Sequence, residues 1–283
     1  MFKKIPGPVC MVIAAILFAL GGLLIKLIPW NALAINGARS ILAVGILYGY
    51  CRLTHHPLKF NKTVFVGAFC LTATNILYSM ANKLTTAGNT IILQFTAPIF
   101  VLIWGFLIFH RKPKKMDLIA CAVVFFGVMI FFIDSLSAGN MLGNFLAVAS
   151  GMTYAGLFMM NEGKDADPLT SVIIGAVMGI VIGLPWLVKV DFAAAEPSTW
   201  AALLALGIFQ LGLAYVFFTE GLKTTPSITA SLLSAIEAIL NPILVAVVMH
   251  EMLTPLSMVG AVIVFVSVVT YNVLAEKQKQ QKA

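Results

Sequence analysis

The sequence predicts an all-α membrane protein of ten transmembrane helices, arranged as two inverted five-helix repeats with both termini in the cytoplasm. Three observations carry this prediction: a strongly apolar composition, ten separate apolar runs, and a similarity between the two halves of the chain. Hydrophobic residues make up 60% of the 283 residues and charged residues only 10%. Soluble domains are about 25% charged, so we expect lipid to cover much of this apolar surface.

Each predicted helix is a run of about 20 mostly apolar residues, the length that crosses a hydrocarbon core. Turn and breaker residues separate the runs, for example Pro29-Trp30-Asn31 and Arg111-Lys112-Pro113. A membrane β-barrel would need alternating polar and apolar residues, which these runs lack. The predicted spans are Val9–Ile28, Ala32–Cys51, Thr63–Ala81, Thr86–Phe109, Met116–Ile133, Leu142–Met160, Thr170–Val188, Thr199–Glu220, Ser227–Met249 and Leu256–Leu274.

The distribution of basic residues predicts the orientation. With a cytoplasmic N-terminus and ten spans, 14 of the 18 Lys and Arg residues fall in inside segments, and only Lys26, Lys83 and Lys189 fall at outside ends. This topology explains the net charge of +7 better than a nucleic-acid partner does. We expect a multi-pass protein of the cell membrane, in a prokaryotic plasma membrane, with no metal or cofactor; the sequence leaves monomer and homodimer open.

The two halves of the chain resemble each other. A shift of 140 residues places Lys83 on Lys223, Thr85 on Thr225 and His110 on His250, and a shift of 136 aligns the starts of the halves. We therefore predict one five-helix repeat over residues 1–134 and a second over 135–283, ending in a short basic cytoplasmic tail. Because five is odd, the second repeat enters the membrane inverted, which is typical of transporters with a midplane site between the halves.

Three local motifs resemble the EamA-type members of the drug/metabolite transporter superfamily. They are residues 38–43 (ARSILA) in the second span, residues 95–98 (FTAP) in the fourth, and residues 236–238 (IEA), followed by residues 250–254 (HEMLT), in the ninth. The resemblance covers residues 9–274. It implies ten helices in two inverted repeats and a carrier of amino acids, other metabolites or organic cations, often outward.

Glu237 is the sharpest candidate for a functional residue. It lies about ten residues into the ninth predicted span, near the bilayer centre, where an ionisable group costs roughly 3 kcal/mol or more. Two functional interpretations are open, cation binding and proton coupling, beside a structural one in which the carboxyl hydrogen-bonds between helices. Ser227, Ser231, Ser234 and Asn241 share its helix face.

Other polar residues extend this candidate site. The fourth span carries a matching polar stripe of Thr86, Thr90 and Gln94, followed by Pro98. Pro98 and Pro242 each remove a helix hydrogen bond and so predict kinks that free the carbonyls of Gln94 and Ala238. The full set of predicted substrate-binding residues is Glu237, Ser234, Gln94, Asn75, Tyr78, Tyr154, Gln210, Tyr215 and Asn241, with Glu237 also the candidate for proton coupling.

Arg39 lies about seven residues into the second span. It has three possible roles: snorkelling to the membrane surface, pairing with an acid, or meeting an anionic solute. We favour a structural role, since in the resembling family this helix is largely peripheral. Trp30, Trp186 and Trp200 lie near predicted outer helix ends and are interpreted as interface anchors.

These residues favour a secondary transporter of a small metabolite such as an amino acid, amine or organic cation, working by alternating access, with export the expected direction and a proton as candidate coupling ion. A passive uniporter or channel-like facilitator is the alternative, although no filter motif is visible. A membrane-embedded enzyme is less favoured, because the four histidines lie at loops or helix ends and neither HExxH nor GxSxG occurs. A Walker sequence is also absent, which argues against ATP as the energy source within this chain.

Overall fold

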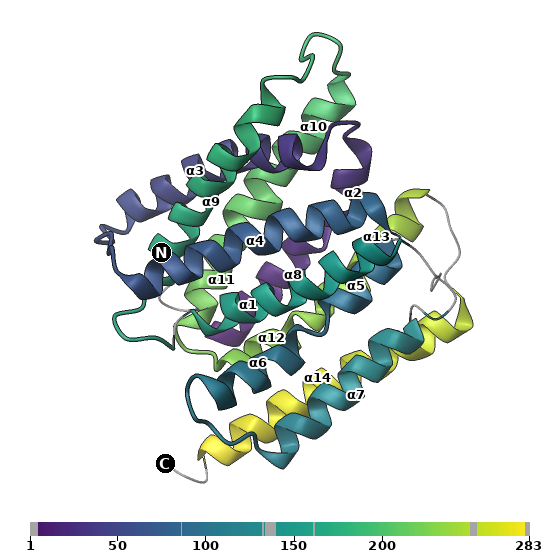
Figure 1. Cartoon of the computed structure of the whole chain (residues 1–283). Helices are drawn as coiled ribbons and strands as arrows, with labels where there is room; N and C mark the ends of the chain where they lie inside the picture. Colours follow the sequence, from purple (N-terminus) through teal and green to yellow (C-terminus); the bar gives the residue numbers. More distant parts are fainter. Residues whose placement is uncertain are drawn as a thin grey trace.

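The computed structural model describes residues 5–85, 87–131, 133, 140–160, 162–249 and 254–280. Within these residues the chain is all-helical and forms ten helices, several of them interrupted (Figure 1). Thr86, His250 and Glu251, which the sequence places at helix ends, lie outside the described residues. In chain order the helices are α1 Gly7–Phe18 with α2 Leu20–Leu27, α3 Ala32–Leu53, α4 Lys62–Leu84, α5 Ala87–Gln94 with α6 Ala97–Leu107, α7 Lys115–Phe131, α8 Met141–Met159, α9 Pro168–Leu187, α10 Pro197–Ala205 with η2 Leu206–Leu213 and α11 Ala214–Leu222, α12 Ser227–Leu233 with α13 Ala235–Met249, and α14 Pro255–Gln280.

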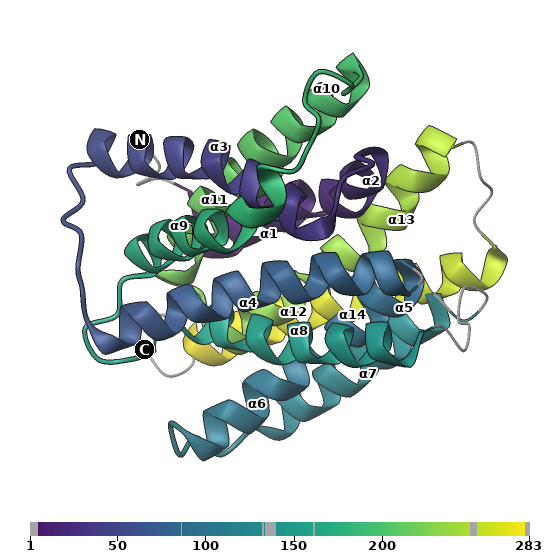
Figure 2. The same cartoon turned by 45° about the horizontal axis from the view of Figure 1, so that its top comes forward.

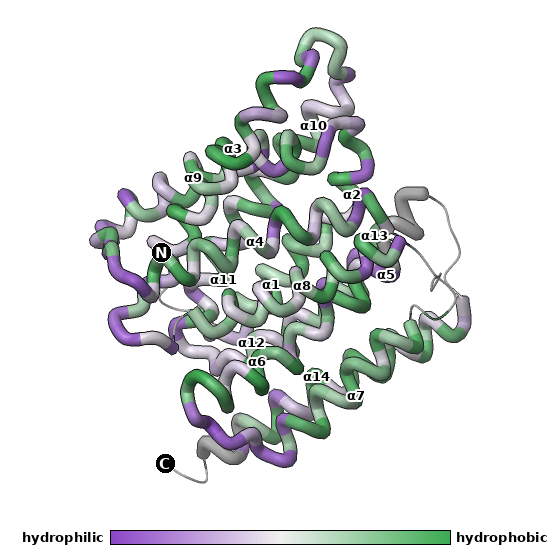
Figure 3. The backbone as a smooth tube through the Cα atoms, in the orientation of Figure 1, coloured by the Kyte–Doolittle hydropathy of each residue, from purple (hydrophilic) through white to green (hydrophobic). Residues whose placement is uncertain are grey.

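The helices match a membrane protein in length and polarity. Among the described residues, eight helices are long and apolar enough to cross a membrane. The other two are α7, with 17 residues, and the α12–α13 helix, which a break divides. Hydropathy along the backbone is high within the helices, while polar residues gather at their ends (Figure 3). Ten helices were predicted, and the residues that the structure describes form ten.

The packing of the helices follows a two-fold pattern. α3 packs against α9, and α7 against α14, which lie side by side in both views (Figures 1 and 2). Each of these pairs joins helices that hold the same place in the order of the two halves. α4 packs against α8 and α9, while the α10–α11 helix, which holds the place of α4 in the second half, packs against α1 and α3. Such an exchange of partners indicates that the two halves are related by a two-fold arrangement.

Two helices break at equivalent places. The fourth helix stops at Gln94 and resumes at Ala97, and the ninth stops at Leu233 and resumes at Ala235. At each break a hydroxyl donates back to a carbonyl of the preceding turn, from Thr96 to Leu93 and from Ser234 to Ser231, both at 2.6 Å. Side-chain hydroxyls that compete for backbone carbonyls weaken helices.

The structure agrees only partly with the kinks predicted at two prolines. The first break directly precedes Pro98, whose missing N–H leaves the Gln94 carbonyl without its helical donor. In the second half, α13 continues as helix through Pro242, and the interruption lies at Ser234 instead. The break in the ninth helix therefore lies at Ser234, whose hydroxyl bonds back to Ser231, and not at the proline.

Hydrogen bonds fasten the α3–α4 loop to the α8–α9 loop. His56 Nε2 lies 2.9 Å from both carboxylate oxygens of Asp167, and Asn61 Nδ2 donates to the carbonyl of Asp165 at 2.9 Å. Asp167 also caps α9 by accepting from the backbone N–H and hydroxyl of Thr170. Burial opposes ionisation of Asp167, but the hydrogen bonds from Thr170 and His56 outweigh it and hold the pKa of this carboxyl below its ordinary value.

We expect Asp167→Asn to lower the melting temperature at pH 7, with a loss of about 1 kcal/mol of stability, because the amide replaces a carboxylate that forms charge-assisted hydrogen bonds with His56 and Thr170. A carboxyl with a lowered pKa in the folded state stabilises the protein above its ordinary pKa of 3.8 and loses that effect as the pH falls further. The difference between wild type and variant should therefore shrink in melting curves recorded below pH 4. Asp165→Asn, on the exposed side of the same loop, should show no such difference. An Asp167→Asn deficit that persists unchanged at low pH would contradict a stabilising role of the ionised Asp167 carboxyl.

Candidate functional site

A small cavity in the middle of the bundle collects most of the predicted site residues. Its volume is about 10 Å³, about the minimum that holds one water molecule. Both broken helices contribute to it, together with α4 and α8. The lining comprises Tyr78, Ile91, Gln94, Phe95, Tyr154, Ser234, Glu237, Ala238 and Asn241. Six of the nine residues predicted from the sequence are among these, and Ile91, Phe95 and Ala238 are additional apolar neighbours.

Glu237 provides the charge of this cavity. It lies in the first turn of α13, directly after the break, and its backbone N–H donates to the carbonyl of Ser234 at 2.9 Å. Tyr154 Oη donates to Glu237 Oε2 at 3.3 Å. Within the described residues, no cationic side chain forms an ion pair with Glu237. A carboxylate that is held by a phenol and lacks a counter-charge is suited to bind a proton or a cation.

Tyr154 and Tyr215 belong to one aromatic cluster. The ring of Tyr154 lies 4.6 Å from that of Phe158, Phe158 lies 5.5 Å from Phe218, and Tyr215 lies 5.8 Å from Phe218. Phe18 of α1 closes the cluster, with its ring 4.9 Å from Tyr215. These contacts hold the phenol of Tyr154 in place against Glu237. Tyr215 is thus placed beside the cavity lining and is not part of it.

Asn75 and Gln210, the remaining predicted residues, bind Arg39. Arg39 is 1% exposed, so the structure excludes snorkelling to the membrane surface. Its Nη2 donates to Asn75 Oδ1 at 2.9 Å, and its Nη1 donates to Gln210 Oε1 at 3.2 Å. Gln210 lies in the π-helical segment η2, which adds a residue to the helix and is a feature often found at functional sites.

The sequence did not reveal this arginine network. Arg39 was visible as a deep charge, but hydropathy does not tell which neighbouring helices will supply its acceptors. Two glycines of η2, Gly207 and Gly212, allow the network to form, because a Cβ at these positions would meet Leu42 and Ile46 of α3 at 2.5 and 2.9 Å. Their five-residue spacing in the sequence was not used in our prediction, and it is a signal that could have indicated a π-helical face against α3.

The outer parts of the predicted polar stripes lie outside the cavity. Ser227 donates its hydroxyl to Glu162, which also accepts from Arg111 at 2.7 Å. Ser231 donates to the carbonyl of Ile228 within its own helix, and Thr90 is buried. Ser227 and Ser231 of α12 therefore bond to the α8–α9 loop and within their own helix, and in the ninth helix the residues that line the cavity lie at and after the break.

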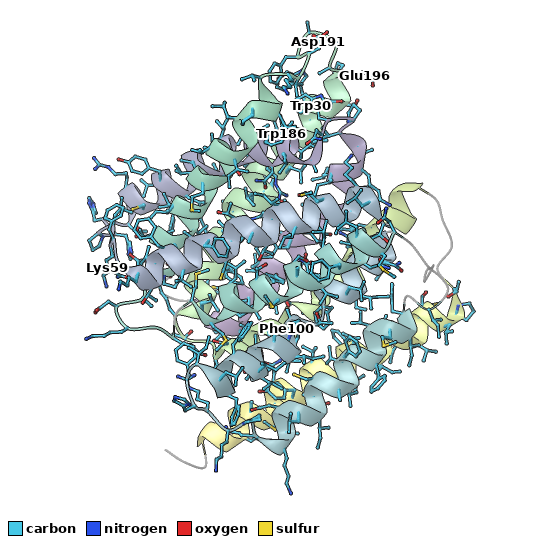
Figure 4. The ribbon with its side chains drawn as sticks, in the orientation of Figure 1. Trp30, Lys59, Phe100, Trp186, Asp191 and Glu196 are labelled. Carbon is cyan, nitrogen blue, oxygen red and sulfur yellow. The ribbon has the colours of Figure 1, made fainter. Side chains whose placement is uncertain are left out.

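A larger cleft of about 680 Å³ lies at one end of the molecule, away from the small cavity. Trp30 and Trp186 line it together with Asp191 and Glu196, and Figure 4 shows these four side chains gathered at the end formed by the α9–α10 loop. Trp30 packs edge-on against Trp200, with ring centroids 6.1 Å apart. None of the nine predicted site residues lines this cleft. We place the candidate site in the smaller cavity, since the deep carboxylate and the converging polar groups lie there.

Comparisons with known proteins agree with this architecture. The sequence model of the EamA-like transporter family matches residues 5–133 and again residues 141–273. The chain is 25% identical over 256 residues to the uncharacterized transporter YwfM of Bacillus subtilis, covering 89% of this chain and 85% of that protein. It is also 25% identical over 181 residues to an uncharacterized transporter of Archaeoglobus fulgidus, covering 59% and 61% of the two chains. A crystal structure described only as that of a protein superposes with a TM-score of 0.77 at 13% identity, over 96% of this chain and 98% of that one.

Proposed function

From the premise that this chain belongs to the EamA-like transporter family, and is therefore a multi-pass membrane transporter, we propose that it moves a small metabolite bearing a positively charged nitrogen by alternating access. The proposal places it in a prokaryotic plasma membrane, with residues 1–134 and 135–283 acting as inverted halves and both termini cytoplasmic. Glu237 is the counter-charge for the solute, and Tyr78, Gln94, Tyr154, Ser234 and Asn241 surround it.

One observation carries this proposal: Glu237 lies at the break of α12–α13 in a central cavity, and its only described side-chain hydrogen bond comes from a tyrosine. Broken helices at the midplane are a recurring way in which transporters build a solute site. The cavity of about 10 Å³ is too small for a metabolite, so the solute must enter by movement of the surrounding helices. Alternating access supplies such a movement, whereas a passive channel needs a continuous path.

Proton coupling follows from the same carboxyl. A single Glu237 side chain that holds either a proton or a cationic solute exchanges one for the other across the membrane. In the direction we propose, the solute leaves the cell while a proton enters. Tyr154 donates to Glu237 Oε2, and because a carboxyl accepts hydrogen bonds in both its ionised and its protonated form, this contact holds the side chain in place during the exchange.

We expect purified protein in proteoliposomes to accumulate a labelled amine or amino acid when the lumen is more acidic than the outside, and to lose this accumulation when a protonophore collapses the gradient. The physical reason is that exchange at Glu237 lets protons flow outward only as solute flows inward. The measurement is uptake over time, with and without the gradient. Protein-free liposomes are the control for passive amine trapping.

Two outcomes would count against parts of this proposal. Solute movement that equilibrates equally fast with and without a gradient, and shows no counterflow, indicates a facilitator or channel. Transport that shows counterflow but ignores the gradient indicates an uncoupled carrier and removes the proton from the mechanism.

A further inference from the structure

Arg39 is a full charge buried in the core with only neutral partners. Besides Asn75 and Gln210, its Nη2 donates to Asn36 Oδ1 at 3.1 Å and lies 3.5 Å from Ser79 Oγ. Its Nε is buried and has no hydrogen-bond partner. In the part of the chain that the structure describes, Arg39 forms no ion pair. The guanidinium thus has amide and hydroxyl oxygens around it but no negative charge.

Such an arrangement is costly if it serves structure alone. A buried charge is usually paired, and amide oxygens offset only part of the desolvation. A guanidinium presents five N–H donors in a planar fork that fits a carboxylate with two parallel hydrogen bonds. Arg39 has an unused donor in that fork, at Nε, and its two terminal nitrogens are held by neutral side chains.

The arginine network and the Glu237 cavity lie next to each other. On α4, Asn75 and Ser79 bind Arg39, while Tyr78, on the same stretch of helix, lines the cavity. Two consecutive glycines of α2 make a second connection. A Cβ on Gly21 would lie 3.1 Å from Gln210, and one on Gly22 would lie 2.5 Å from Asn241.

Gly21 and Gly22 thus bring two side chains against one short segment of α2. Gln210 is an acceptor for Arg39, and Asn241 lies one helical turn after Glu237. Consecutive Cα atoms are about 3.8 Å apart, so Gln210 and Asn241 approach α2 within one residue of each other. Among the described residues, Arg39 and Glu237 form no ion pair, and the residues that surround them meet at α2 and α4.

We propose that Arg39 is the second charge of the solute site, and that the transported solute carries a carboxylate as well as a charged amine. The inference rests on the proposed function and narrows its solute class to zwitterions of amino-acid type. The carboxylate takes the place of Asn75 and Gln210 on the guanidinium while the amine meets Glu237. Because Gln210 belongs to η2 and Asn75 to α4, this exchange couples solute binding to the packing of these two helices on α3.

We expect wild-type protein in lipid nanodiscs to bind at least one proteinogenic amino acid about tenfold or more tightly than the amine formed by its decarboxylation, since a charge-assisted pair is worth that much. The measurement is isothermal titration calorimetry with matched pairs, such as phenylalanine with 2-phenylethylamine and leucine with 3-methylbutylamine. In Arg39→Gln the preference should fall to about one, mainly through weaker binding of the amino acid. Arg52→Gln, on the exposed end of the same helix, should keep the wild-type preference.

The outcomes separate this inference from the proposed function. If the amines bind wild type as tightly as the matched amino acids do, Arg39 does not bind the solute, and the proposed function still stands. This comparison uses wild type alone, so it remains valid even if Arg39→Gln fails to fold. A folded Arg39→Gln that weakens both members of a pair equally shows a structural arginine. If neither amino acids nor amines bind wild type, the proposed function fails, and this inference fails with it.

Discussion

Glu237→Gln lowers the affinity for an amine-bearing solute by roughly 30- to 150-fold, because the variant keeps the shape of the side chain and loses its charge. An amide oxygen still accepts the hydrogen bond that Tyr154 donates in the wild type at 3.3 Å, so the aromatic wall should stay in place. The lost interaction is a charge-assisted one in a water-poor cavity, worth about 2–3 kcal/mol. The measurement is solute-induced thermal stabilisation and uptake, compared between wild type and variant.

The same substitution separates a functional carboxyl from a structural one. Without solute, Glu237→Gln should melt at or above the wild-type temperature, since an amide costs less to bury in this core than a carboxylate. Glu196→Gln, at an exposed position, is the matched control and should change neither property. A Glu237→Gln protein that is much less stable but binds the same solutes equally well would show that the carboxyl holds helices together.

Hydropathy and loop chemistry predicted the helices well. Every predicted span lies over an observed helix, and the ninth, Ser227–Met249, shares both its ends with the α12–α13 segment. This success has a physical basis, since a backbone in lipid must satisfy its hydrogen bonds within the helix and therefore leaves long apolar runs in the sequence.

The interruptions of the helices were harder to predict. Proline is a strong signal in sequence, and Pro98 did mark the break in the fourth helix. Ser234 carries no comparable signal, because a serine hydroxyl either faces a neighbouring helix or bonds back to its own, as here to Ser231, and only the packing decides. The π-helical turn at Leu206–Leu213 likewise depends on the fit of Gly207 and Gly212 against α3.

For the site, the sequence supplied the residue types and the structure supplied their neighbours. Glu237 was found because a midplane acid is rare, and the helix face it shares with Ser234 and Asn241 followed from periodicity. Which neighbouring helix faces that side chain depends on the tertiary packing, so the hydrogen bond from Tyr154 of α8 could not be derived from the sequence. For the same reason the sequence did not predict that Arg39 lies near the cavity. The two regions meet at Gly21 and Gly22, and glycines carry no side chain whose chemistry would indicate a contact.

Gly183→Ala lowers the melting temperature by several degrees, because α3 and α9 touch backbone to backbone at this point. A Cβ on Gly183 would lie 2.6 Å from both the Cα of Gly37 and the carbonyl oxygen of Leu33. Neither is the end of a flexible side chain, so the helices must separate. Overpacking of this kind costs about 1–3 kcal/mol, and close contact between small residues is what holds membrane helices together.

Gly45→Ala provides the matched control on α3. A Cβ at Gly45 would meet nothing within 4 Å, so alanine there gains helix propensity, worth about 0.5–1 kcal/mol, with no clash. The two variants should therefore shift the melting temperature in opposite directions, and equal shifts would refute the close contact. Gly37 lies one position from Asn36 and two from Arg39, so a wider α3–α9 spacing also displaces the guanidinium. We accordingly expect Gly183→Ala to weaken the binding of amino acids more than the binding of their matched amines. The packing of α3 on α9 would then affect which solute the protein prefers.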